Sequence, residues 1–327
     1  MFIGSLLSLA ALAADGPQSG RIALTPMTEV RFASADEGRA ILTANDTFTA
    51  SMSRFDLQCR LTTDKEVSLD DWKRFVAEHV RDWQIAEIQT VSESLGRLKK
   101  LMADLRLPLP PVIQLMRTTG DEENGAAYTR NSAIVLPTRV LGYDKIQMDR
   151  LLAHELFHLL SRHDGAIRAR LYKIIGFEVC EPIELPASLA ARRITNPDAP
   201  LIDCTMGLPA KDGKTIVGAP ILYSEAKQYD AKSGKTLFQS FIFRLLVVER
   251  TPENGPWKPV LRNGQPVVLN PREEQAFLDK IGQNTNYIIH PDEILADNFV
   301  RLVMHDQNVP TPRIIDEMRR VLERPMN

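Results

Sequence analysis

Residues 151–160 read LLAHELFHLL, a run in which two histidines and a glutamate interrupt an otherwise apolar segment. His154 and His158 are four residues apart, so on an α-helix their imidazoles project from the same face, one turn apart. That spacing lets both rings reach one tetrahedral ion. Glu155 lies about 100° further around the helix, where it can contact a water at such an ion without being a ligand. The HExxH pattern therefore predicts a metal-binding helix that its apolar flanks bury.

The residues before this run predict how the helix begins. Asp144 followed three residues later by Gln147 is typical of a capping box, and Gly165 is a typical C-terminal glycine. The helix is therefore expected to begin after Asp144 and to end just before Gly165. Residues 126–129 and 133–136 read as two short strands around a tight turn, so the histidines lie in a helix that follows a hairpin.

A second helical pattern precedes the hairpin. Ser68 and Asp71 resemble a capping box, and apolar residues recur at helical spacing after them. One long helix is therefore expected from Ser68 to Leu105. The proline-rich stretch 107–111 ends this helix and begins an extended run.

The order of these patterns predicts how the chain is organised. Residues 238–248 and 259–269 read as strands between turn-rich segments, which predicts a β-rich insertion after the motif helix. The chain shows no internal repeat or low-complexity tract, so residues 15–327 are expected to form one compact unit. Its expected parts are a signal peptide in 1–14, a mainly helical part in 15–111, the sheet and motif helix in 112–165, the insertion with its β-rich part in 166–286, and C-terminal helices in 287–327.

The N-terminus is apolar from Phe2 to Ala14 and contains the small-x-small pattern Ala11-Leu12-Ala13 of a signal-peptidase site. We expect an export signal cleaved near Ala13 or Ala14, and hence a periplasmic or secreted protein. A buried helix is the alternative, because no lysine or arginine precedes the run. No stretch is long and apolar enough to be an integral membrane segment. A formal net charge of −2 gives no reason to expect nucleic acid as a partner.

A catalytic zinc needs a third protein ligand and an open fourth position. One candidate is Asp164, which lies ten residues after His154, where the metzincin pattern places its third ligand. That pattern also needs a glycine at the position that Ser161 occupies. The other candidate is Glu293, in the segment HPDEILADNF, where proline at position 291 predicts the first turn of a helix.

Glu293 and Asp297 are four residues apart and therefore share one face of that helix. A glutamate can ligate zinc, and an aspartate one turn later can orient a ligating imidazole. The alternative interpretation of Glu293 is a first-turn acid that interacts with the helix dipole. With HExxH upstream, the sequence favours Glu293 as the ligand.

HELFH together with EILAD resembles the gluzincin clan of zinc metallopeptidases, whose third ligand is a glutamate in an ExxxD helix. GAAYTRNSAIVLP followed by HELFHLLSRH is most similar to the CAAX-prenyl-endopeptidase and HtpX-like gluzincins and their soluble periplasmic relatives. The resemblance covers about residues 124–163 and 290–301. The separation of His158 from Glu293 is long for thermolysin-like enzymes, and the transmembrane helices of the membrane-bound members are absent.

The resemblance implies a zincin-like α+β fold, in which the active-site helix packs on a small mixed sheet. It implies a metalloendopeptidase that hydrolyses peptide or protein substrates with one Zn²⁺, held by His154, His158 and Glu293. Glu155 would act as general base toward a zinc-activated water, and Asp297 would orient one of the histidines. An edge strand would bind extended substrate, with contacts from Ala126, Ala127, Tyr128 and Thr129.

The oxyanion of the reaction also needs a hydrogen-bond donor. Tyr287 and His290 are the leading candidates, because they lie just before the helix of Glu293. Tyr128 is a third candidate. Two other functions stay open. The first alternative is a noncatalytic zinc- or partner-binding protein derived from a peptidase fold, and the second is a metzincin-like enzyme with Asp164 as third ligand. The presence of Glu155 favours catalysis, because a structural zinc has no use for a base.

Overall fold

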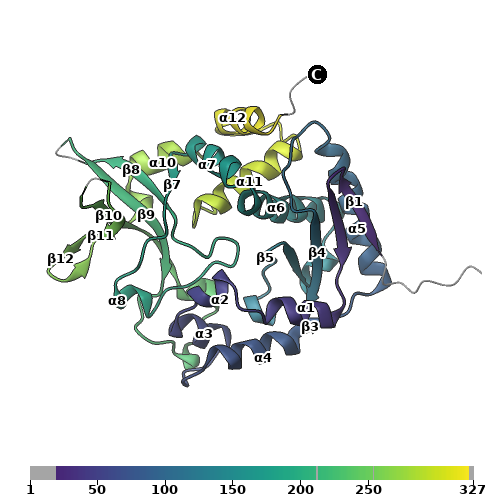
Figure 1. Cartoon of the computed structure of the whole chain (residues 1–327), viewed down its shortest axis with the longest axis horizontal. Helices are drawn as coiled ribbons and strands as arrows, with labels where there is room; N and C mark the ends of the chain where they lie inside the picture. The colour runs from purple at the N-terminus through teal and green to yellow at the C-terminus, as the bar shows by residue number, and fades with distance from the viewer. Residues whose placement is uncertain (1–19, 211–212, 253, 324–327) are drawn as a thin grey trace, which may run out of the picture.

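The computed structural model describes residues 20–210, 213–252 and 254–323, and over these ranges the chain has the expected mixed α+β fold (Figure 1). Two sheets lie on opposite sides of the molecule, and helices α6 (Lys145–His163) and α11 (Pro291–Val303) lie between them. The expected signal peptide lies outside the described residues. Among the helices of the described ranges, none is long and apolar enough to cross a membrane.

The first sheet contains the strands that precede the HExxH helix. Its strands are β1 (Arg21–Thr25), β2 (Thr28–Phe32), β3 (Val80–Arg81), β4 (Val112–Thr118), β5 (Tyr128–Arg130) and β6 (Ala133–Pro137). Along the order β1-β2-β4-β6-β5, the central β4 is parallel to β2 and β6, whereas β5 is antiparallel to β6 and forms one outer strand. The expected hairpin is thus present, but its first strand begins at Tyr128 rather than at residue 126.

The expected single helix from Ser68 to Leu105 is wrong. The structure has two helices there, α4 (Leu69–His79) and α5 (Ile85–Leu101), with the short strand β3 between them. β3 pairs with the end of β4, and Glu87 accepts a hydrogen bond from the backbone N–H of Gln84 to cap α5. Strand pairing and this cap interrupt a helical pattern that continues in the sequence.

Three shorter helices precede α4. They are α1 (Ala35–Leu42), α2 (Thr47–Ser51) and α3 (Arg54–Arg60). A buried cluster of charges ties this part to the rest of the chain, because Arg60 contacts both Asp56 on its own helix and Glu123 in the 3-10 helix η1 (Asp121–Glu123). The described residues up to 111 contain helices α1 to α5 and also supply three strands of the first sheet, β1, β2 and β3.

Helix α6 follows the hairpin and the 3-10 helix η2 (Thr138–Gly142). Asp144 caps its N-terminus and the helix ends at His163, as expected. Gly165 does not terminate it, however, because this residue opens the next helix, α7 (Gly165–Ile174). The apolar flanks of the histidines are fully buried in the main core: Leu152, Ala153, Leu156, Phe157, Leu159 and Leu160.

The second sheet lies in the expected insertion. Its strands are β7 (Phe177–Val179), β8 (Cys204–Pro209), β9 (Thr215–Tyr223), β10 (Ile242–Arg250), β11 (Trp257–Pro259) and β14 (Val268–Leu269). Neighbouring strands in this sheet pair antiparallel to one another. The expected strand 238–248 begins only at Ile242, because residues before it form the short helix α9 (Leu237–Ser240) with a Thr236–Gln239 capping box. Cys59, Cys180 and Cys204 are free thiols.

The expected strand 259–269 is also broken into short pieces, which include the separate pair β12 (Leu261–Arg262) and β13 (Gln265–Pro266). Between the strands lie α8 (Ala187–Ala190) and the 3-10 helices η3 (Ala231–Ser233) and η4 (Pro271–Glu273). The chain continues through α10 (Gln275–Ile281), α11 and α12 (Pro312–Leu322). α11 packs along α6, and α7 packs against α6, α11 and α12, so α7 belongs to the helical layer although the sequence placed it in the insertion.

Candidate metal centre

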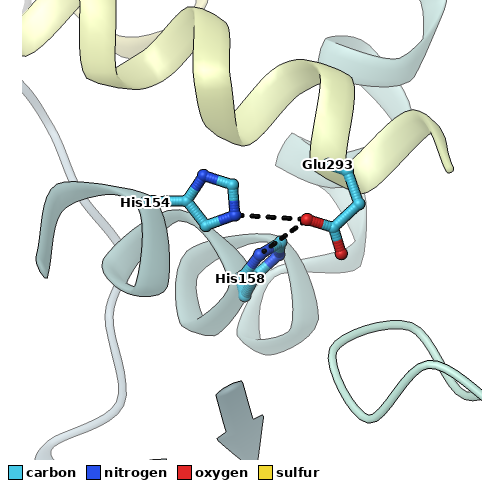
Figure 2. Close-up of side chains that lie close together, drawn as sticks. All are labelled: His154, His158 and Glu293. Carbon is cyan, nitrogen blue, oxygen red and sulfur yellow. Dashed lines mark hydrogen bonds and ion pairs between the residues drawn. The ribbon is translucent and has the colours of Figure 1, made fainter. Parts of the chain in front are cut away.

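Helices α6 and α11 bring the two sequence motifs together. His154 and His158 project from α6 toward the carboxylate of Glu293, which points back from the first turn of α11 (Figure 2). Oε2 of Glu293 lies 3.2 Å from Nε2 of His154 and 3.5 Å from Nε2 of His158. One donor atom from each of the three residues lies within 4.8 Å of the others, which makes them a possible metal-ligand group.

These distances fit a zinc-type ion. Two atoms bound to one tetrahedral zinc, each at about 2.0–2.2 Å, lie about 3.4 Å apart. The two nitrogen–oxygen separations, 3.2 and 3.5 Å, match that value. In addition, Nε2 of His158 is buried and has no hydrogen-bond partner. Buried polar atoms without partners are costly, so this nitrogen is suited to a ligand.

Each imidazole is held by a carboxylate at its other nitrogen. Nδ1 of His154 lies 3.1 Å from Oδ1 of Asp297, and Nδ1 of His158 lies 2.7 Å from Oδ2 of Asp292. This arrangement fixes the ring orientation and the tautomer and directs each Nε2 toward Glu293. Asp297 is therefore placed on His154, one of the two histidines it was expected to orient.

Asp292 lies at the candidate metal centre, and its position was not predicted from the sequence. It is buried, and its Oδ1 accepts hydrogen bonds from Ser161 at 2.5 Å and from the hydroxyl of Tyr172 at 2.9 Å. Burial alone would raise the pKa of Asp292. The hydrogen bond and the charge of His158 have a larger effect in the opposite direction, so the pKa lies below its usual value and the carboxylate stays ionised. The sequence signal was a second acid directly before Glu293, which the ExxxD spacing does not include.

Glu155 faces the same centre from the next position on α6. The residue is buried, and its Oε2 has no hydrogen-bond partner. Burial, followed by the charge of Asp198, raises the pKa of Glu155 to about 8. A carboxylate with a raised pKa and a free oxygen can take up and release a proton near neutral pH.

The pKa values of both imidazoles are raised, so a proton and a cation would compete for the same ring nitrogens. Burial alone would lower the pKa of His154, but its hydrogen bonds to Asp297 and Glu293 raise it to about 10. The pKa of His158 is also raised, because nearby carboxylates outweigh its burial. A cation bound between the imidazoles and Glu293 replaces these protons, since ligation requires neutral imidazoles.

A cavity of about 700 Å³ opens onto this centre. His154, Glu155 and Glu293 line it, together with Tyr287 and Ala127. Of the two leading candidates for an oxyanion donor, Tyr287 is therefore at the cavity. His290 is not among its lining residues, because the ring caps α11: its Nδ1 accepts the backbone N–H of Asp292.

The expected substrate-binding strand differs from the observed one. Ala126 and Ala127 precede β5. The hydroxyl of Tyr128 donates to Oε1 of Glu122 at 3.4 Å, and Tyr128 belongs to a buried apolar cluster that includes Phe48 and Trp72. Thr129 donates its backbone N–H to Oδ1 of Asp198 at 2.7 Å. The outer edge of β5 is thus already paired with a side chain of the insertion.

Two residues of the segment between α8 and β8 reach the centre, and neither was singled out from the sequence. Asn196 donates from Nδ2 to Oε1 of Glu293 at 2.6 Å. Asp198 forms, with Glu155 and His158, a second group whose donor atoms lie within 4.8 Å of one another. The only sequence signal was an Asn-Pro pair, which indicated a turn.

Asp164, the alternative third ligand, lies away from both groups. Its carboxylate caps α7 by accepting the N–H groups of Ala166 and Ile167, each at 3.0 Å. Ser161, which stands where the metzincin pattern has glycine, donates to Asp292 inside the continuous helix α6.

Comparisons of the chain with protein-family models, with curated proteins and with solved structures find no match.

Proposed function

We propose that the protein is a zinc metallopeptidase of the gluzincin type, with a zincin-like arrangement of α6 on the first sheet. The observation that carries this proposal is the position of Oε2 of Glu293, 3.2 Å from Nε2 of His154 and 3.5 Å from Nε2 of His158. The buried, unpartnered oxygen of Glu155 lies beside this cluster. Three ligands and one free base are the set that metal-assisted hydrolysis requires.

When bound, Zn²⁺ supplies Lewis-acid chemistry that polarises a peptide carbonyl and makes a water molecule more acidic. Glu155 would take the proton of the attacking water and pass it to the leaving amine. Its pKa of about 8 without an ion falls in the presence of a cation, because a positive charge favours the carboxylate. Asp292 and Asp297 hold the imidazoles in place, and Tyr287 in the cavity wall is the candidate donor to the oxyanion.

A noncatalytic zinc-binding protein is the second candidate function. The contact between Asp198 and the backbone of Thr129 favours it, because this contact occupies the edge where an extended substrate would pair. Glu155 favours the peptidase, because a purely structural ion needs no adjacent base.

Export of the chain stays a prediction, since the expected signal peptide lies outside the described residues.

The test combines metal analysis with peptide cleavage for the wild type, Glu155→Gln and Glu293→Ala. We expect about one zinc per chain in the wild type and in Glu155→Gln, and a large loss of zinc in Glu293→Ala. Cleavage of a peptide library should be measurable only in the wild type. A wild type that binds no zinc would overturn the proposal, and a zinc-loaded wild type whose cleavage equals that of Glu155→Gln would favour the noncatalytic function.

A further inference from the structure

Helices α6 and α11 lie side by side, and the contacts between them pair earlier residues of α6 with later residues of α11. His154 on α6 contacts Asp297 on α11 in this way. Arg150 lies one turn before His154, and Arg301 lies one turn after Asp297. The facing surfaces of the two helices therefore continue past the metal centre to a pair of arginines.

Both arginines line the cavity of about 700 Å³ that opens onto the metal centre. Nη1 and Nη2 of Arg150 donate to the two carboxylate oxygens of Asp306, each at 3.0 Å. Nη1 of Arg301 lies 3.7 Å from Oδ2 of the same carboxylate, which is beyond hydrogen-bond distance. Asp306 is not among the residues that line the cavity. Two guanidinium groups at the cavity wall thus share one carboxylate that lies outside that wall.

Arg301 is the arginine with donors to spare. Among the described residues, its side chain makes one hydrogen bond, from Nε to the carbonyl oxygen of Asn284 at 2.9 Å. A guanidinium carries five N–H groups, so its Nη atoms keep donors for a ligand. Asp297, the acid one turn before Arg301, is already engaged by His154 and by the hydroxyl of Thr285.

The metal end of the cavity has a different balance of charge. The carboxylates that line this end are those of Glu155, Asp198, Glu293 and Asp297. The imidazoles of His154 and His158 have raised pKa values and supply positive charge beside these acids, and a bound ion would replace that charge. Positive charge at the metal end is therefore matched by acids. At the arginine end, the described residues supply two guanidinium groups for one carboxylate.

A carboxylate is the ligand that the arginine end selects. A guanidinium matches the geometry of a carboxylate and binds it through two parallel hydrogen bonds. The rise along α6 from Arg150 to His154 is about 6 Å, which is close to the length of two residues of an extended peptide. A peptide whose scissile bond lies at the metal centre therefore brings a carboxylate about two residues away to the arginines.

We propose that Arg150 and Arg301 form a carboxylate-binding subsite, and that the substrates are peptides with a carboxylate about two residues from the cleaved bond. This inference rests on the proposed peptidase function. The carboxylate comes either from the C-terminus of the peptide or from an acidic side chain, because both present the same pair of oxygens to a guanidinium.

Binding is measured first, in Glu155→Gln protein so that the peptides stay intact. The probes are peptides of uncharged residues with fluorescein at the N-terminus. They end in a free carboxylate, in an amide, or in an amide that follows a terminal glutamate. Fluorescence anisotropy gives each Kd with zinc and with EDTA. Charge-assisted hydrogen bonds predict about tenfold tighter binding of a carboxylate peptide than of the plain amide, in both conditions. The charged peptide that shows this gain identifies the source of the carboxylate.

Four variants separate a binding subsite from a structural ion pair. Arg301→Gln should remove most of the carboxylate preference, and Arg301→Lys, which keeps the charge without the planar fork, should retain part of it. Arg320→Gln, at an exposed position of α12 outside the cavity lining, should leave it unchanged. Asp306→Asn should increase the preference, because both guanidinium groups then lose their shared carboxylate, whereas a purely structural pair predicts no increase. Each preference is a ratio within one protein, so a lower folded fraction does not alter it.

Cleavage of the same peptides by the zinc-loaded wild type tests the link to hydrolysis. We expect kcat/KM to be about tenfold higher for the preferred carboxylate peptide than for the plain amide. Equal binding of the charged and amidated peptides, or a preference that survives Arg301→Gln, would overturn the subsite. In the second case, loss of the preference in EDTA would identify the ion as the anchor. A preference that depends on Arg301, in a protein that cleaves none of the peptides, would support the subsite and overturn the peptidase.

Discussion

Asp292 allows the sharpest test of how the metal centre is organised. In the wild type its Oδ1 accepts two hydroxyl hydrogen bonds, from Ser161 and Tyr172, and its Oδ2 contacts Nδ1 of His158 at 2.7 Å. In Asp292→Asn the two hydroxyl donors retain the single oxygen of the amide, so the amide N–H₂ must face His158. The ring is then driven to the tautomer that carries its proton on Nε2, the atom needed for ligation.

The expected loss of zinc affinity follows from this change of tautomer. Loss of a carboxylate behind a ligating histidine weakens metal binding by about 10–100-fold, which corresponds to about 1.4–2.8 kcal/mol. We expect Asp292→Asn to fall in this range, with little change in the fold because both hydroxyls keep an acceptor. Titration with a zinc-buffered fluorescent competitor measures the affinity.

Ser161→Ala is the matched control for Asp292→Asn. It removes one donor to Oδ1 but leaves the contact of Asp292 with His158 intact. We expect the free energy of unfolding to fall by about 1 kcal/mol, since one buried hydrogen bond is lost, and zinc affinity to change by only a few-fold. Equal zinc affinities of Asp292→Asn and the wild type would refute the orienting role of Asp292.

Three further outcomes are expected. Zinc at about 100 times its Kd should stabilise the protein by about 2.7 kcal/mol, and calorimetry with and without a chelator should show a Tm higher by several degrees. Leu152→Ala, at a fully buried position of α6, should lower the free energy of unfolding by about 2–5 kcal/mol in denaturant titrations. Because the pKa of His154 is raised to about 10 in the metal-free protein, its stabilising contribution is complete below pH 6.5 and is lost as pH rises through 10. Zinc-loaded protein should lack this part of the pH dependence, and an identical pH profile with and without zinc would contradict the assigned contacts of His154.

Local patterns were sufficient to predict the two helices that carry the proposed ligands. Helical periodicity and a capping residue define α6, and Pro291 defines the start of α11, so the faces of His154, His158 and Glu293 follow from residue spacing. What the spacing leaves open is whether two distant helices meet. Their contact depends on packing in the common core and is seen only in the folded chain.

Other features depend on contacts between distant residues and have no local signature. The segment at residues 80–84 continues a helical pattern, yet Val80 pairs with Thr118 of β4 and ends the helix. Asn196 and Asp198 lie in a turn-like stretch, and their position is set by hydrogen bonds to Glu293 and Thr129. The sequence predicted the insertion but not its contact with the centre. An irregular segment has no residue periodicity, so no pattern indicates which of its side chains contacts a distant helix.

The long separation of α6 from α11 along the chain has a consequence for biosynthesis. The second sheet is encoded between them, so the two histidines leave the ribosome well before Glu293 does. A growing polypeptide thus lacks one of the three proposed ligands until the C-terminal helices have docked on the core. Under the proposed function, hydrolysis would therefore require the C-terminal helices, because Glu293 is synthesised after the second sheet.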